Sequence, residues 1–195
     1  MPDYGPKTAL VVVDVQNDFA DPKGSLYVTG GDQVIPLINQ EVERATAAGA
    51  FVVYTQDWHP PTTPHFKKDG GIWPVHCVGA TWGAALHPAL RVEGPVVRKG
   101  SGGGDGYSGF TVRDPSSGET TATSLDELLR ERNIERLVIC GLATDYCVVE
   151  TAVDARMLGY PVEVIAAAIR AVNLDPGDGD RAISRMREAA AEVLV

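Results

Sequence analysis

The chain has 195 residues, of which 44% are hydrophobic, and its 17 basic and 26 acidic side chains give a formal net charge of −9. A chain of this length buries enough apolar surface for one globular core and is short for two, so we expect a single domain over residues 1–195. The acidic balance, with no basic cluster, would repel a phosphate backbone and excludes nucleic acid as a partner.

Two sequence features bear on the compartment of the protein. The first apolar run, residues 9–13, stops at Asp14 after five residues, which is too short for a signal peptide or a membrane span. The three cysteines, Cys77, Cys140 and Cys147, form an odd set without a CxxC pair, which argues against a disulfide framework. These features predict a cytoplasmic protein with no membrane partner.

Short apolar, β-branched runs recur along the chain, with helix-like stretches between most of them. Apolarity that is continuous rather than alternating predicts strands buried on both faces of a parallel sheet. The runs cover residues 9–13, 50–54, 95–98, 137–140, 162–165 and 193–195. Strands that alternate with helices predict an α/β domain of three layers.

Capping residues and glycines mark the expected helices. A helix over residues 32–49 has an aspartate as its candidate N-cap and a glycine at its end. Ser124 and Glu127 match a capping box at the start of a second helix. A third helix is expected over residues 145–159, and a fourth over residues 181–191.

Two stretches, residues 55–94 and 100–123, are longer than ordinary connections, and long loops inside a compact domain are usually functional. The second stretch begins within the glycine-rich segment KGSGGGDGYSGF, residues 99–110. The glycines of this segment invite comparison with a phosphate cradle. The segment lacks the lysine followed by Ser or Thr at a helix start that a P-loop requires, so we reject that interpretation.

Polar residues follow four of the predicted strands. Asp14 follows the first, Asp57 the second and Lys99 the third, and the segment 141–147 follows the fourth. Ligands of open α/β sheets bind beyond the carboxyl ends of the strands. We therefore expect these segments to converge at one edge of the sheet, although Asp14 taken alone would be interpreted as a capping carboxylate.

Cys147 is the candidate nucleophile. It lies two residues after Asp145, in the first turn of its predicted helix, where free N–H groups and the helix dipole favour a thiolate. A free cysteine has a pKa of about 8.5, so activation also needs a base. Asp14 can be that base, and Lys99 can support both anions. The alternative is a buried, inert cysteine, which Cys140 fits better because it lies inside an apolar strand.

Three of the chain's four histidines and one carboxylate fall within twenty residues. They are Asp57, His59, His65 and His76. Mixed imidazole and carboxylate ligands suit zinc, iron or manganese, and the ligand types leave the choice among these metals open. The alternative is a group of histidines that are merely solvated. His87 is distant and interpreted as structural, and Cys77 is left out because adjacent side chains point apart in an extended segment.

Seven motifs run through nearly the whole chain. They are VVDVQNDF at 12–19, TQDWHP at 55–60, His65, WPVHC at 73–77, KG at 99–100, DGYSGF at 105–110 and GLATDYC at 141–147. In this order they resemble the nicotinamidase/pyrazinamidase branch of the isochorismatase-like hydrolases. The resemblance implies a six-stranded parallel sheet flanked by helices. It also implies hydrolysis of nicotinamide to nicotinate and ammonia, a step in NAD salvage, and of pyrazinamide.

The resemblance further implies roles for individual residues. The implied catalytic triad is Asp14, Lys99 and Cys147, and the implied ligands of one divalent metal per chain are Asp57, His59, His65 and His76. The implied substrate contacts are Phe19, Trp73, Tyr107 and Leu142. The Leu142–Ala143 bond matches a non-proline cis peptide, and the N–H groups of Ala143 and Cys147 match an oxyanion hole. The metal is implied to hold the pyridine nitrogen and thereby to position the amide.

Other functions stay open. The same triad serves amidases of the superfamily that act on N-carbamoyl or ureido substrates, which generally lack the metal ligands. A catalytically silent module that binds a metal or nicotinamide is a further alternative. The segment 166–173 departs from the family pattern, because Ala167 and Ala171 stand where members often carry an acidic residue and a glycine. This departure bears on loop geometry or assembly, and a homo-oligomer is left open.

Overall fold

The computed structural model describes residues 1–195 and places six strands in one sheet. The strands are β1 (Thr8–Val13), β2 (Phe51–Asp57), β3 (Val96–Lys99), β6 (Arg136–Leu142), β7 (Val162–Arg170) and β8 (Glu192–Leu194). They are hydrogen-bonded in the order β3-β2-β1-β6-β7-β8, and every neighbouring pair is parallel. The predicted six-stranded parallel sheet is therefore confirmed.

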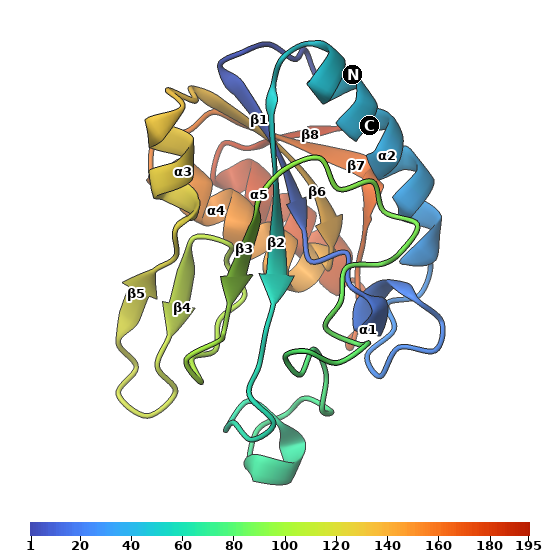
Figure 1. Ribbon diagram of the computed structural model, residues 1–195, viewed down its shortest axis with the longest axis vertical. Helices are drawn as coiled ribbons and strands as arrows, with labels where there is room; N and C mark the ends of the chain where they lie inside the picture. Colours follow the sequence, from blue (N-terminus) through green and yellow to red (C-terminus); the bar gives the residue numbers. More distant parts are fainter.

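Helices cover both faces of this sheet (Figure 1). They are α1 (Asn17–Ala20), α2 (Ile35–Ala47), α3 (Leu125–Glu131), α4 (Val149–Met157) and α5 (Asp178–Glu188). All six residues of β1 are buried, and alternate side chains enter opposite faces. Ala9, Val11 and Val13 pack in one cluster with α3, α4 and α5, whereas Leu10 and Val12 pack in a second cluster with α2. The predicted three-layer arrangement is confirmed.

The carboxyl ends of the central strands β1 and β6 lie side by side, in register at Val13 and Gly141. Gly141 has φ +118°, and a Cβ added to it would lie 2.1 Å from the carbonyl oxygen of Val13, so this position requires glycine. The next residue after β1, Asp14, has φ +47°, which turns the chain out of the sheet. The two strands therefore deliver Asp14 and the segment after Gly141 to the same edge.

Two predicted helix caps differ from the structure. Asp32 lies inside a 3-10 turn (Asp32–Val34), and its carboxylate accepts a hydrogen bond from a nearby tyrosine hydroxyl at 2.6 Å, so α2 begins only at Ile35. The capping box of Ser124 and Glu127 is wrong, because Ser124 makes no side-chain capping hydrogen bond. The hydroxyl oxygen of Thr123 accepts instead from the first N–H of α3, at 3.2 Å. The side chain one residue earlier thus takes over the capping function.

The expected helix after β6 also starts differently. Residues Thr144–Val148 form a π-helical turn, and α4 follows from Val149. The carboxylate of Asp145 does not cap this turn but accepts hydrogen bonds from the backbone N–H groups of Val172 at 2.9 Å and Asn173 at 2.8 Å. Asp145 therefore ties the turn that contains Cys147 to the loop after β7.

The two long loops carry short elements that the sequence pattern does not reveal. A 3-10 turn, η2 (Lys67–Asp69), lies in the first loop, and an antiparallel hairpin of β4 (Thr111–Arg113) and β5 (Thr120–Ala122) lies in the second. All of β5 is exposed, so no apolar alternation marks it. The 3-10 turn of the first loop and the tip of the β4–β5 hairpin lie beyond the carboxyl ends of the strands, whereas the later part of the first loop runs back toward the start of β3 (Figure 1).

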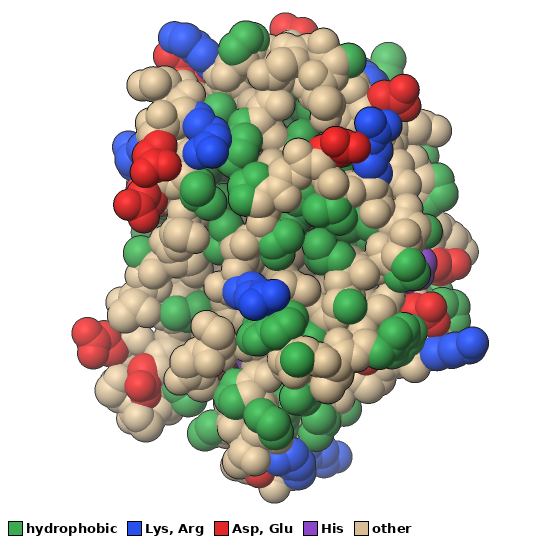
Figure 2. Space-filling model, viewed as in Figure 1, with side chains coloured by type: hydrophobic (Ala, Val, Ile, Leu, Met, Phe, Trp, Pro, Cys, Tyr) green, Lys and Arg blue, Asp and Glu red, His purple; other side chains and the backbone are tan.

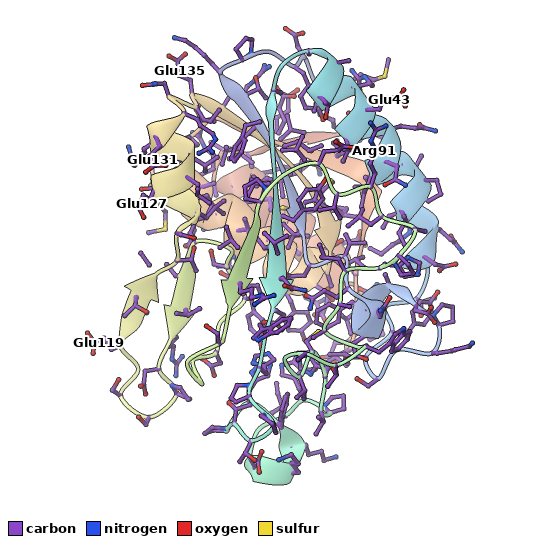
Figure 3. The ribbon with its side chains drawn as sticks, in the orientation of Figure 1. Glu43, Arg91, Glu119, Glu127, Glu131 and Glu135 are labelled. Atoms are coloured by element: carbon purple, nitrogen blue, oxygen red, sulfur yellow. The ribbon has the colours of Figure 1, made fainter.

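Charged side chains of both signs are scattered over the visible surface. On the face drawn in Figure 2, acidic and basic groups are interspersed and form no continuous basic patch. Glu127, Glu131 and Glu135 project outward from α3 and the turn after it (Figure 3). None of the helices combines the length and the apolar character that a bilayer crossing requires.

Candidate active site and metal centre

Lys99 is the point at which three of the predicted site residues meet. It is the last residue of β3 and pairs in register with Asp57, the last residue of β2. Its ammonium nitrogen lies 2.9 Å from Asp14 Oδ2, 3.1 Å from Asp57 Oδ1 and 3.5 Å from the sulfur of Cys147. The Lys99 side chain is 1% exposed, so water does not screen these contacts.

The two carboxylates keep Lys99 charged. Burial alone would lower the pKa of Lys99, because it penalises a cation in a low-dielectric interior. The charges of Asp14 and Asp57 outweigh this effect and hold the pKa of Lys99 well above its ordinary value. Lys99 therefore acts as a fixed positive charge at the carboxyl edge of the sheet.

Asp14 is a carboxylate held next to this cation. It is fully buried, and its Oδ1 accepts a hydrogen bond of 2.7 Å from the hydroxyl of Thr55 on the neighbouring strand. Burial raises the pKa of Asp14, while the positive charge of Lys99 opposes that rise without cancelling it. A carboxylate whose pKa is raised accepts a proton more readily, which suits a base.

Cys147 is buried, and its surroundings decide whether its thiol is protonated. Burial raises the pKa of the Cys147 thiol well above its ordinary value, although Lys99 pulls it down. The negative charge of Asp14 adds to the rise, because it disfavours a second anion nearby. Desolvation thus outweighs the helix terminus, which agrees with the expectation that activation of Cys147 also needs a base. The thiol keeps its proton in the resting site, and Asp14 is the candidate base for it, because Asp14 and Cys147 both contact the ammonium group of Lys99.

The three histidines of the first long loop converge beside Asp57. Ligand nitrogens of His59, His65 and His76 lie within 4.8 Å of one another, and all three residues are buried. Asp57 Oδ2 lies 2.9 Å from His59 Nε2 and 3.6 Å from His76 Nε2. The alternative of merely solvated histidines is excluded by this burial.

The chemistry of this cluster fits a divalent transition metal. Burial lowers the pKa of His65 to about 4, so its imidazole is neutral and offers a lone pair at pH 7. Three converging imidazoles with one carboxylate form a donor set of the kind that binds zinc, iron or manganese. The Nδ1 atom of His59 is buried without a hydrogen-bond partner, as expected of a ring that turns its other nitrogen toward Asp57.

A small cavity opens beside the cysteine and two of the histidines, and the space there amounts to about 380 Å³ when the part open to solvent is included. Its lining residues are mostly apolar. They are Phe19, Leu26, Val28, Asp57, His65, Trp73, His76, Tyr107, Ala143, Tyr146, Cys147 and Val172.

Three loops contribute an aromatic wall to the cavity. Trp73 donates a hydrogen bond from its indole nitrogen to the Tyr107 hydroxyl at 3.0 Å. Tyr146 packs edge-on against both, with ring centroids 4.9 Å from Trp73 and 5.1 Å from Tyr107. Phe19, from α1, contacts the ring of His76 with centroids 5.5 Å apart. These contacts fix the orientation of the aromatic rings before any ligand enters.

Leu142 differs from the other expected substrate contacts. Its side chain is fully buried in the core cluster that contains α2, and it does not line the cavity. The bond from Leu142 to Ala143 is a non-proline cis peptide. Ala143 does line the cavity, and its N–H donates no hydrogen bond within the chain, so it is free to meet a ligand oxygen.

The model of the isochorismatase domain family matches residues 8–195. The chain belongs to the isochorismatase family. The match includes every strand of the sheet and all of the residues that surround the cavity.

Several members of the isochorismatase family are closely similar to this chain. A nicotinamidase of Escherichia coli strain K12 is 38% identical, and the alignment covers 95% of this chain and 93% of the relative. A pyrazinamidase of Pyrococcus horikoshii, solved in complex with zinc, has a TM-score of 0.86 at 36% identity and covers 97% and 99% of the two chains. PnC1 from L. infantum, solved in complex with nicotinate, has a TM-score of 0.87 at 34% identity and covers 99% and 95%.

Segment 166–173, in which a departure from the family pattern is expected, borders the site, and Val172 is its one residue that lines the cavity. Strand β7 bulges here, since its pairing with β6 shifts register between Ile139 and Gly141. Ala167 is exposed, and neither it nor Ala171 lines the cavity. Ala171 packs near Gly179, where an added Cβ would lie 2.8 Å away. The departure therefore affects the junction of β7 with α5.

Sequence reasoning missed several residues of this family's cavity. Leu26, Val28 and Val172 lie in loops, and no periodic pattern marks them. Tyr146 was detectable in principle, because it adjoins the candidate nucleophile within the motif GLATDYC. An aromatic residue next to a nucleophile is a signal that could have been used.

Proposed function

We propose that this protein is a single-domain, metal-containing cysteine amidohydrolase that converts nicotinamide and water into nicotinate and ammonia, and that also accepts pyrazinamide. One observation carries the proposal. The ammonium group of Lys99 lies within 3.5 Å of Asp14, Asp57 and Cys147, so it links the candidate nucleophile to the histidine cluster at the base of one aromatic cavity. The similarity to a nicotinamidase and to a nicotinate-bound structure supports the choice of substrate.

The chain's own groups supply the acylation chemistry. Asp14 takes the proton of the Cys147 thiol, and the sulfur attacks the carboxamide carbon. The N–H groups of Ala143 and Cys147 stabilise the oxyanion that forms. The tetrahedral intermediate collapses as protonated Asp14 passes its proton to the leaving nitrogen, which releases ammonia and leaves a thioester. Lys99 offsets the negative charge on sulfur and carboxylate throughout.

Deacylation uses the same groups in reverse. Asp14, again a carboxylate, removes a proton from a water molecule that attacks the thioester carbon. The same two N–H groups stabilise the second oxyanion. Collapse of this intermediate breaks the carbon–sulfur bond, returns a proton to Cys147 and releases nicotinate.

We propose that Asp57, His59, His65 and His76 hold one divalent metal per chain, with zinc, iron and manganese as the candidates. When bound, the metal would supply a Lewis acid that coordinates the pyridine nitrogen. Phe19 and Trp73 would flank the ring and so orient the carboxamide toward the sulfur. The zinc complex of the similar P. horikoshii protein supports a divalent metal.

The compartment and the metabolic role follow as proposals. All three cysteines are unpaired and buried, which suits a reducing compartment such as the cytoplasm. We infer a role in salvage of nicotinamide for NAD, with the small-molecule substrate as the main partner.

Ammonia release from four substrates tests the proposed function. We would compare nicotinamide, pyrazinamide, benzamide and an N-carbamoyl amino acid with purified, metal-loaded protein. Benzamide keeps the ring size and the carboxamide but lacks the ring nitrogen, and loss of such a polar partner discriminates by as much as ~10⁴-fold in kcat/KM. Equal kcat/KM for benzamide and nicotinamide would show that the ring nitrogen is not recognised. A preference for the N-carbamoyl compound would assign the protein to a different branch of the family.

A further inference from the structure

Gln16 is a fully buried polar side chain that the mechanism does not use. It lies three residues after the end of β1, and its amide makes three hydrogen bonds to the backbone. Its Nε2 group donates to the carbonyl oxygens of Asp57 at 2.8 Å and Ala84 at 2.9 Å. Its Oε1 atom accepts from the N–H of Asp57 at 2.8 Å. Both backbone polar groups of Asp57 are thus held by one side chain.

This arrangement replaces a missing strand partner. The pairing of β1 with β2 ends at Val12 and Tyr54, so Asp57 projects beyond the last residue of β1 that could bond it. On its other side β2 still pairs with β3, where Asp57 is in register with Lys99. The side chain of Gln16 therefore completes the hydrogen bonding of Asp57 on the side that β1 leaves open.

The position of Asp57 is critical because its two carboxylate oxygens serve different neighbours. Oδ1 lies 3.1 Å from the Lys99 ammonium, and Oδ2 lies 2.9 Å from His59 Nε2. A small rotation of the Asp57 backbone would change both distances together. Groups that orient ligands in this way commonly affect metal affinity by 10- to 100-fold.

We propose that Gln16 is a positioning residue that sets the Asp57 carboxylate between the metal centre and Lys99. This inference rests on the metal centre of the proposed function. Loss of the Gln16 amide frees the Asp57 backbone and weakens metal binding by about 10- to 100-fold. Because the metal centre orients the substrate ring, KM for nicotinamide rises more than kcat falls at limiting metal.

Gln56 provides a matched control. Its side chain is also buried, and its Nε2 group donates to the same carbonyl oxygen of Ala84, at 2.8 Å. Its Oε1 atom accepts a hydrogen bond from Arg98 at 3.2 Å and none from the backbone of Asp57. Replacement of Gln56 therefore disturbs the loop around Ala84 as replacement of Gln16 does, but leaves both backbone bonds of Asp57 in place.

The experiment compares Gln16→Met and Gln56→Met in the full-length protein. Zinc affinity is measured without substrate, by competition with a chromophoric chelator, and kcat and KM for nicotinamide are measured separately. We expect Gln16→Met to weaken zinc binding at least ~10-fold and Gln56→Met to weaken it less than ~3-fold. Equal losses in the two variants would overturn the proposal, because the Ala84 loop would then carry the effect. Unchanged zinc affinity in Gln16→Met would overturn it as well.

Gln16→Glu serves if Gln16→Met does not fold. The glutamate keeps the acceptor for the Asp57 N–H and loses the amide donors, so we expect a weaker zinc affinity than that of Gln56→Met. An affinity equal to that of Gln56→Met would contradict the proposal. Wild-type protein that binds no zinc would overturn the metal centre itself. Zinc binding without hydrolysis of nicotinamide would overturn the proposed substrate while leaving the role of Gln16 intact.

Discussion

Replacement of Lys99 by methionine would leave two buried carboxylates without their shared cation. Methionine matches the length of lysine and keeps the apolar contacts, so the change isolates the charge. Lys99 lies 2.9 Å from Asp14 and 3.1 Å from Asp57, and its side chain is 1% exposed. Removal of one partner from such a buried pair typically costs about 3–5 kcal/mol. We expect Lys99→Met to lower the free energy of unfolding of the metal-free protein by that amount.

The loss should depend on pH in a defined direction. Burial already raises the pKa of Asp14, and Lys99 is the group that opposes the rise, so the variant raises that pKa further. A carboxyl group with a raised folded-state pKa destabilises the fold while it is ionised, and the penalty disappears as pH falls through that pKa. Urea unfolding in the presence of a chelator should therefore show a larger difference between wild type and variant at pH 8 than at pH 5.

An exposed ion pair provides the control for this measurement. Lys68 lies 2.7 Å from Asp69, but its side chain is 43% exposed, so Lys68→Met should cost less than about 1 kcal/mol. Losses below 1 kcal/mol for both variants would refute the assignment of Lys99 as the charge that the buried carboxylates require. Loss of amidase activity in Lys99→Met is expected whatever the size of the stability loss, so activity alone does not show whether Lys99 stabilises the two carboxylates.

Two further predictions concern the nucleophile and the metal centre. Cys147→Ala should lower kcat for ammonia release by roughly 10⁶-fold with the fold intact. Cys140→Ala should instead lower the free energy of unfolding by about 1 kcal/mol and keep activity. A third or more of wild-type activity in Cys147→Ala would contradict the mechanism. Gly100→Ala should weaken zinc binding about 10-fold, because the new Cβ would lie 3.1 Å from Nδ1 of the proposed metal ligand His59. Gly103→Ala is its control, since Gly103 also has a positive φ, +84°, but no atom within 4 Å, and equal zinc affinities would refute the contact argument.

Much of the fold could be predicted from local sequence patterns. The buried runs around Val11 and Ile139 consist of consecutive apolar residues, which is typical of strands covered on both faces, and the structure confirms the parallel sheet. The placement of Asp14, Asp57 and Lys99 at strand ends followed from the same pattern. The strand ends of a parallel sheet share one edge, so sequence position alone indicated which side chains would be neighbours.

The remaining features depend on contacts that local patterns do not encode. Thr123 rather than Ser124 caps α3, because the path of the preceding loop decides which hydroxyl reaches the free N–H. The raised pKa of the Cys147 thiol comes from burial by distant segments, which outweighs the helix terminus visible in the sequence. Tyr146, which lines the cavity, lies in a π-helical turn, where the sequence pattern predicts the start of an α-helix.

The groups of the site lie on strands that differ in local stability. Asp14 follows β1, a central strand bonded on both sides, whereas Lys99 ends β3, a four-residue strand at the edge with a single neighbour. Edge strands open at lower free energy than the central part of a sheet. Fraying of β3 would carry the cation away from Asp14 while most of the fold persisted. Heat inactivation is therefore expected to precede the loss of secondary structure, and amide hydrogen exchange should be faster along β3 than along β1.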